Sequence, residues 1–161
     1  MVNTRVFHDP IHKEIIINSS KDEELMIMEL IETEAFQRLR RIKQLGPASL
    51  IFHGAESSRF THSIGVFCVA RQIFNKLVEI NPNFEKNRFI VYGAALLHDL
   101  GHGPFSHAAE FAMPRAIDLN VTNDPHRRAS HEDYTVALLT QSSLDGVLHS
   151  NFTFSDDTSI H

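Results

Sequence analysis

The chain has 161 residues, the size of one domain, and its 42% hydrophobic and 22% charged residues are typical of a globular protein. Fifteen basic against 20 acidic residues give a net charge of −5, which argues against nonspecific binding to nucleic acid. A single cysteine excludes an internal disulfide framework, and neither a signal peptide nor a membrane-spanning run is found. We therefore expect a cytoplasmic protein without a membrane partner.

The first 46 residues predict a β-hairpin followed by two helices. Residues 5–7 and 13–17 are predicted as strands, since β-branched isoleucines fill the second of them. Residues 20–23 spell a capping box before the first helix. The apolar spacing over 33–45 predicts a second helix with a basic outer face, which ends at Gly46-Pro47.

The rest of the chain predicts further helices. We expect a long helix over 60–80, another over 85–98, a short one over 104–112, a loop over 113–128, and a helix over 130–141 that Ser130 caps together with Asp133. Residues 142–161 are expected to form a polar tail. The predicted fold is mostly α with a short N-terminal β-hairpin.

The chain contains 11 histidines and no tryptophan, and its densest polar cluster lies between Leu96 and His107. His98 and Asp99 come at the end of an apolar helix, where burying both is costly unless something pairs with them. A divalent iron, manganese or zinc ion suits imidazole and carboxylate ligands. His62 is the best third ligand, provided that the two long helices are antiparallel neighbours. A lone histidine is more often a hydrogen-bonded core residue, but this combination favours a site.

Five strings along the chain carry a family resemblance. They are VFHDPIH at 6–12, FQRLRRIKQLG at 36–46, RFTHSIGV at 59–66, LLHDLGHGPFSHAAE at 96–110 and SHED at 130–133. In these strings the sequence resembles the HD-domain phosphohydrolases, and most closely their deoxynucleoside triphosphate triphosphohydrolases, which include animal members with SAM and HD domains. The resemblance implies a helical HD-domain fold. It also implies hydrolysis of a dNTP to a deoxynucleoside and tripolyphosphate, by attack of water on the α-phosphorus.

The resemblance further implies how the metal and the substrate are bound. It implies three ligands for iron, manganese or zinc, with Mg²⁺ accompanying the nucleotide, and these ligands are His62, His98 and Asp99. Arg59 matches a residue that contacts the substrate phosphates, work that suits a guanidinium by its geometry and permanent charge. Gln44 and Leu45 match the deoxyribose pocket, with Gln44 on the 3′-hydroxyl and Leu45 crowding a 2′-hydroxyl.

For the catalytic step, the resemblance implies four more residues. His102 and His107 match histidines near the triphosphate, and His107 is the expected general acid for the leaving 5′ oxygen. Glu110 stands where the family usually has aspartate, and His131 matches a histidine beside it. Glu110 and His131 would orient the His107 side chain and favour its protonated, charged form.

An activating nucleotide is a further expectation from the resemblance, together with a homo-oligomer, dimer or tetramer, of the full-length protein. Arg5, Gln37 and Arg40 match contacts to such a nucleotide between subunits. Glu32 replaces an aspartate that reads guanine, and His8 replaces an asparagine. The alternative is that the segment FQRLRRIKQL only forms an amphipathic helix whose basic face lies in solvent.

One expected ligand has no counterpart in the sequence. HD domains complete their metal site with a second aspartate on a later helix, and none of Asp145, Asp156 and Asp157 lies in a matching motif. We therefore interpret residues 1–161 as the N-terminal part of a longer HD phosphohydrolase, inactive or impaired alone. Two alternatives stay open: an HD phosphohydrolase acting on another nucleotide phosphate ester, and a non-catalytic nucleotide-binding or assembly module.

Overall fold

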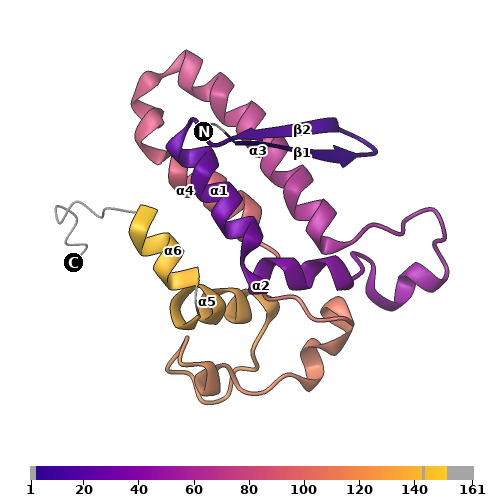
Figure 1. The fold of residues 1–161 in the computed structure, drawn as a ribbon. Coiled ribbons are helices and arrows are strands. Elements are labelled where there is room, and N and C mark those ends of the chain that lie inside the picture. The colour runs from indigo at the N-terminus through magenta and orange to yellow at the C-terminus, as the bar shows by residue number, and fades with distance from the viewer. Residues whose placement is uncertain (1–2, 143, 152–161) are drawn as a thin grey trace.

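The computed structural model describes residues 3–142 and 144–151, and the protein is mostly helical with one two-stranded sheet (Figure 1). Strands β1 (Thr4–Asp9) and β2 (Lys13–Asn18) pair in antiparallel fashion. Ile15 and Ile17 of β2 are fully buried, whereas the residue between them is 47% exposed, because alternate residues of a strand point to opposite faces. The predicted fold class and hairpin are confirmed.

A series of helices follows the hairpin. The α-helices are α1 (Asp22–Glu32), α2 (Glu34–Gln37), α3 (Arg59–Ile80), α4 (Arg88–Leu97), α5 (His131–Gln141) and α6 (Leu144–Asn151). Short 3-10 segments lie between them: η1 (Arg38–Arg41), η2 (Gly46–Leu50), η3 (Pro82–Asn87), η4 (Ser106–Ala112) and η5 (Ala116–Leu119). None of the helices within 3–142 and 144–151 is both long and apolar enough to cross a membrane.

The core lies where α4 packs against both α3 and α1, with β2 against α1 and α3 (Figure 1). Phe67 of α3 and Tyr92 of α4 meet edge to face, with their ring centroids 5.3 Å apart. Leu96 and Leu100 are fully buried at the end of α4. This packing holds the start of α3 beside the end of α4.

Helix capping follows the prediction at one helix and departs from it at another. The backbone N–H of Ser130 donates to the Asp133 carboxylate at 2.8 Å, as expected for the start of α5. The capping box expected at residues 20–23 is wrong, because Lys21 precedes α1 without a side-chain cap. Glu24 instead turns back and accepts the backbone N–H of Asn18 at 2.7 Å, so it ties α1 to β2.

The helix expected over 33–45 is broken into two pieces. The α-helical part ends at Gln37, and η1 continues only to Arg41. Ile42 is extended because its carbonyl accepts the backbone N–H of Arg59 at 2.8 Å, where the chain pairs with the segment entering α3. The helix expected over 104–112 is likewise shorter, and it is the 3-10 segment η4. Tertiary pairing thus overrides a clear helical period.

Residues 144–151 form α6, although they were expected to belong to a polar tail. Leu144 is fully buried, and Val147 and Leu148 pack against the core, because these three residues follow the i, i+3, i+4 spacing of one helix face. Helix α6 contacts both α1 and α5. Asp156 and Asp157 lie outside the described residues.

We expect Leu144→Ala to lower the free energy of unfolding by about 2–5 kcal/mol, because it removes a fully buried side chain from the contact with the core. The matched control is Val136→Ala on α5, where the side chain is 47% exposed and a loss below about 0.5 kcal/mol is expected. Urea unfolding followed by circular dichroism measures both. Equal small losses would show that α6 is not part of the core.

Candidate active site

Three helix ends bring the candidate site residues together. Ser58 caps α3 by accepting the backbone N–H of Thr61 at 3.2 Å, so Arg59 and His62 lie one turn apart on the same face of α3. Helix α4 ends at Leu97, and the turn after it carries the other candidate ligands. The start of α5 lies against this turn.

The structure brings His62, His98 and Asp99 into one cluster, with one ligand atom of each within 4.8 Å of the others. The Nε2 atoms of His62 and His98 lie 3.6 and 3.5 Å from different oxygens of Asp99. The Nδ1 atom of His98 bonds to the carbonyl of Ala95 at 3.0 Å, which leaves its Nε2 free as a ligand. Both histidine side chains are about a third exposed, so an ion can enter from solvent.

The protonation states of these groups suit a divalent ion. Burial alone would raise the pKa of the Asp99 carboxyl, but His98 and the Arg59 guanidinium outweigh it and lower that pKa below its usual value. Burial lowers the pKa of His62. A carboxylate and neutral imidazoles are the forms that bind metals, so the residues present fit a transition-metal ion.

Arg59 is the charged partner of Asp99 and is only 3% exposed. Its Nη1 donates to Asp99 at 2.5 Å and its Nη2 donates to Ser106 at 2.7 Å. Its Nε has no hydrogen-bond partner among the described residues. The guanidinium therefore lies buried beside the cluster of His62, His98 and Asp99, which is called the metal-type cluster below.

A second histidine cluster adjoins the first. Glu110 accepts hydrogen bonds from the Nδ1 atoms of His131 and His107, at 2.7 and 3.1 Å on the same carboxylate oxygen. The His131 hydrogen bond is the main cause that lowers the pKa of Glu110. Burial and the nearby Arg59 lower the pKa of His102 to about 4, so this imidazole is neutral at pH 7.

His102, His107 and His131 also lie within the distances of a metal cluster, but their orientation argues against a shared ion. The rings of His102 and His131 are stacked, with centroids 3.8 Å apart and planes only 15° from parallel. A metal lies close to the plane of each imidazole that binds it, and two parallel planes this far apart do not meet at one ion. The arrangement is instead suited to hydrogen bonding and proton transfer.

The residues expected at the sugar lie beside Arg59. The carbonyl of Gln44 accepts from Arg59 Nη2 at 3.4 Å, and the buried side-chain oxygen of Gln44 has no hydrogen-bond partner among the described residues. Leu45 is 37% exposed. Gly46 has a φ of +54°, and a Cβ there would come within 3.2–3.3 Å of residues 105–106, so the turn fits closely against the segment that enters η4.

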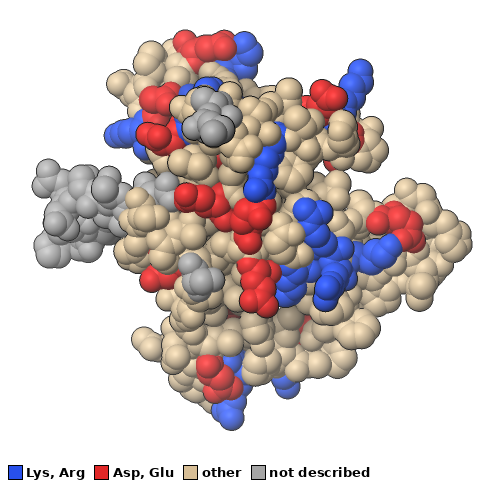
Figure 2. Space-filling model, viewed as in Figure 1, with Lys and Arg blue, Asp and Glu red and all other residues tan. Residues whose placement is uncertain are grey.

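The residues expected at an activating nucleotide form two separate pairs. Arg5 makes an ion pair with Glu32, and Arg40 donates from Nε to Gln37 at 2.7 Å. The Arg40 guanidinium also stacks over Phe60, 3.6 Å from the ring centroid. Figure 2 shows basic side chains gathered over α2 and the segment after it, beside acidic side chains along α1.

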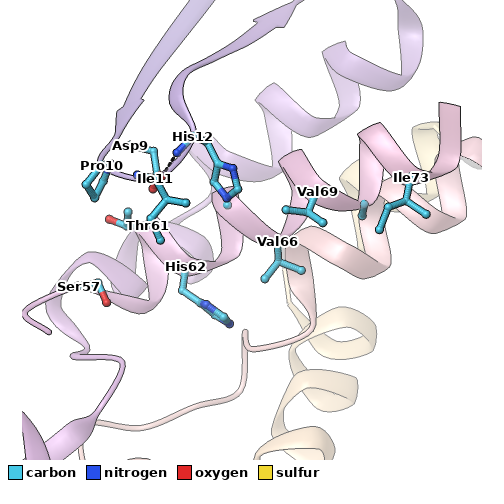
Figure 3. A pocket seen from close by; sticks show the side chains of 12 residues that line it. Asp9, Pro10, Ile11, His12, Ser57, Thr61, His62, Val66, Val69 and Ile73 are labelled. Carbon is cyan, nitrogen blue, oxygen red and sulfur yellow. Dashed lines mark hydrogen bonds between the residues drawn. The ribbon is translucent and has the colours of Figure 1, made fainter. Parts of the chain in front are cut away.

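An apolar groove of about 450 Å³ runs along α3 from the β1–β2 turn, and His62 lies at its edge (Figure 3). Val66, Val69 and Ile73 line it, at the spacing of one helix face. The Asp9 carboxylate closes the turn at its other side by accepting the backbone N–H of His12 at 2.7 Å. His62 was predicted as a metal ligand, whereas no sequence pattern predicted this groove.

Two residues near the site had no predicted role. Arg38 belongs to the segment whose basic face was expected to lie in solvent, yet it donates to the carbonyls of Leu100 and His102. Thr135 on α5 accepts the backbone N–H of Gly101 at 2.8 Å. No local sequence signal predicts either contact, because each joins residues more than 30 positions apart.

The part of the chain that carries these clusters matches a known protein family. Residues 59–150, more than half of the chain, match the HD domain family. This chain belongs to the HD domain family. The metal-type cluster and the whole histidine cluster lie inside the matched residues.

The sequence is also similar to those of individual proteins. A deoxynucleoside triphosphate triphosphohydrolase SAMHD1 from Xenopus laevis is 38% identical over 151 residues, which is 91% of this chain and 21% of that protein. The uncharacterized protein YwfO from Bacillus subtilis is 48% identical over 107 residues, 66% of this chain and 24% of that protein. The chain thus spans less than a quarter of the length of these relatives.

A solved structure has the same fold. A hypothetical protein from Aquifex aeolicus superposes with a TM-score of 0.68 at 31% identity, over 96% of this chain and 35% of that one. HD-family membership and the helical HD fold with a short hairpin are therefore established for this chain.

We expect Arg59→Gln to lower the free energy of unfolding in EDTA by about 3–5 kcal/mol, because it leaves Asp99 buried without its partner. Added Mn²⁺ should recover part of that loss, since a cation can also neutralise Asp99. Urea unfolding with EDTA or with Mn²⁺ measures both effects.

The matched control is Arg71→Gln, which breaks a half-buried ion pair with Glu24, whose oxygen lies 3.4 Å away. Its loss of stability should not shrink with Mn²⁺. Equal recovery of the two variants would contradict the view that Arg59 and a metal share one carboxylate.

Proposed function

We propose that this chain carries the catalytic centre of a metal-dependent phosphohydrolase that converts deoxynucleoside triphosphates to deoxynucleosides and tripolyphosphate. HD-family membership supports metal-dependent phosphohydrolase chemistry. The observation that carries the finer proposal is the adjacency of the His62–His98–Asp99 cluster, Arg59 and the His107–Glu110 pair. The name of the SAMHD1 relatives supports the dNTP as substrate.

The metal ligands in this proposal are His62, His98 and Asp99, which would hold iron, manganese or zinc, with Mg²⁺ accompanying the nucleotide. When bound, such an ion polarises a phosphoryl oxygen and makes a water molecule more acidic. The hydrogen bond from His98 Nδ1 to Ala95 orients that imidazole, and Arg59 keeps Asp99 ionised.

Arg59 and His102 are the proposed triphosphate-binding residues. The guanidinium of Arg59 is permanently charged and lies beside the ligand cluster, where phosphate oxygens compete for its Nη atoms with Asp99 and Ser106. His102 is neutral at pH 7, so it offers a hydrogen bond without repelling the metal. Negative charge on the phosphates is therefore met by one arginine and the ion.

His107 is the proposed general acid. Its side chain is 66% exposed, so a leaving group can reach it, and Glu110 holds its Nδ1. The Glu110 carboxylate orients the imidazole, so that in this role its Nε2 would give a proton to the leaving 5′ oxygen. His131 shares the same Glu110 oxygen and keeps that carboxylate in place.

Gln44 and Leu45 are the proposed sugar contacts. The buried side-chain oxygen of Gln44 has no partner among the described residues, so it is available to accept a hydrogen bond from the 3′-hydroxyl. Leu45 lies next to it and offers an apolar surface against which a 2′-hydroxyl would lose its hydration.

Activation by a nucleotide and assembly of the full-length protein into a dimer or tetramer belong to the proposal as well. Arg5, Glu32, Gln37 and Arg40 are the residues that would bind the activator. Their present pairing means that a nucleotide would have to displace the Arg5–Glu32 and Arg40–Gln37 contacts.

A non-catalytic nucleotide-binding module is the second candidate for the chain by itself. Neither metal-type cluster of the described residues includes a second aspartate. Asp145 is on α6, where its carboxylate faces His149 at 3.0 Å. A site with three ligands binds an ion less firmly than a complete one. The chain by itself would then bind a nucleotide without hydrolysing it.

The full-length protein, incubated with each of the four dNTPs and Mn²⁺, should release the deoxynucleoside and tripolyphosphate, measured by HPLC. We expect His107→Ala to reduce kcat by about 10²–10⁴-fold, as for the loss of a general acid. Asp99→Ala should abolish turnover with nearly unchanged helix content by circular dichroism.

The control is His149→Ala, which removes an exposed histidine of α6 that has no proposed role and should leave kcat unchanged. Orthophosphate released from a nucleoside monophosphate, with no tripolyphosphate from any dNTP, would favour another phosphate ester as the substrate. Stoichiometric metal without any hydrolysis would favour the binding module.

A further inference from the structure

The turn at residues 98–103, which carries Asp99 and His102, is held from one side by Arg38 of η1. Its Nη1 donates to the carbonyl of His102 at 2.8 Å, and its Nη2 donates to the carbonyl of Leu100. A guanidinium is rigid and planar, so bonding both carbonyls fixes their positions relative to each other.

Arg38 differs in this respect from the neighbouring arginines. Arg40 bonds to the side chain of Gln37 and stacks on Phe60, whereas Arg38 donates to two backbone carbonyls. Its charge instead faces carbonyls just beyond the C-terminus of α4, where a cation is favourable because the helix dipole is negative there. The contact therefore belongs to the turn and not to a solvated basic face.

Thr135 of α5 holds the same turn from the other side. Its hydroxyl accepts the backbone N–H of Gly101 at 2.8 Å and donates to the carbonyl of His131 at 3.0 Å. Thr135 is 8% exposed, so water does not replace these bonds easily. One hydroxyl thus joins the turn to the helix end that carries His131.

The approach between the turn and α5 is too close for any side chain. A Cβ built on Gly101 would lie 2.0 Å from the carbonyl oxygen of His131 and 2.4 Å from the backbone nitrogen of Thr135. The turn therefore rests directly on the backbone of the first turn of α5.

We propose that Arg38 and Thr135 are positioning residues of the metal site, which clamp the turn at 98–103 so that Asp99 and His102 keep their places. They touch neither metal nor substrate. Their effect is to pre-form the ligand geometry, so that binding an ion need not order the turn. This inference rests on the proposed function, since it assumes that His62, His98 and Asp99 bind the metal.

The test measures Mn²⁺ affinity by electron paramagnetic resonance on the full-length protein, together with melting temperatures in EDTA. Arg38→Gln and Thr135→Val should each weaken Mn²⁺ binding about 10–100-fold, as loss of a residue that orients a ligand does. Thr135→Ser keeps the hydroxyl and should restore the affinity. Arg38→Lys can reach only one carbonyl at a time and should restore part of it.

Each variant has a matched control. Arg41→Gln removes an exposed arginine from the same segment. Thr140→Val removes a hydroxyl of α5 that donates to the carbonyl four residues earlier, as Thr135 does, but that has no contact with the turn. Both controls should bind Mn²⁺ like the wild type.

The outcomes separate the two claims. A wild-type protein that binds no Mn²⁺ would overturn the proposed metal site and this inference with it. A wild-type protein that binds Mn²⁺ as tightly as Arg38→Gln and Thr135→Val would overturn the inference alone. Lower melting temperatures in EDTA with unchanged affinity of the folded protein would assign these residues a purely structural role, which also overturns it.

Discussion

A carboxylate that is taken out of water needs positive charge nearby, and Asp99 meets this need through Arg59. Asp99 is 7% exposed and Arg59 3%, so each is costly to bury without the other. Their contact requires that the first turn of α3 lie beside the end of α4, which the core packing of these helices ensures. His62 and His98 then lie near different oxygens of the same Asp99 carboxylate.

The positive charge of Arg59 also acts on the neighbouring His102. Burial and Arg59 lower the pKa of His102 to about 4, so this imidazole is neutral at pH 7, whereas His107 and His131 both contact the Glu110 carboxylate. One arginine thus favours the ionised form of the Asp99 carboxylate and the neutral form of the His102 imidazole.

The sequence was enough to predict the hairpin, the long helices and the meeting of His62 with His98 and Asp99. The hairpin and the long helices follow from local signals, which are alternation in β2 and apolar spacing in α3 and α4. The meeting of His62 with the His-Asp pair was expected on the condition that the two long helices pack as antiparallel neighbours. The break after Gln37 was not predictable, because it depends on pairing of Ile42 with the distant residue Arg59.

Other features depend on contacts between distant segments for the same reason. The helical spacing of Leu144 and Val147 was visible in the sequence. These side chains pack against the core because α6 contacts α1, and the spacing alone does not predict that contact. The partners of Arg38 lie more than 60 residues away, and nothing near Arg38 distinguishes it from Arg41. Long-range hydrogen bonds to backbone carbonyls leave no pattern in composition or period.

The absence of a side chain at Gly101 has a consequence for how this region tolerates change. Because the backbone of the turn rests on the backbone of α5, the two segments have no layer of side chains between them that could repack around a substitution. Changes at Gly101, at Thr135 and in the first turn of α5 should therefore combine non-additively in their effects on stability. A substitution at Gly101 or at Thr135, 34 positions away, is therefore expected to disturb both segments together.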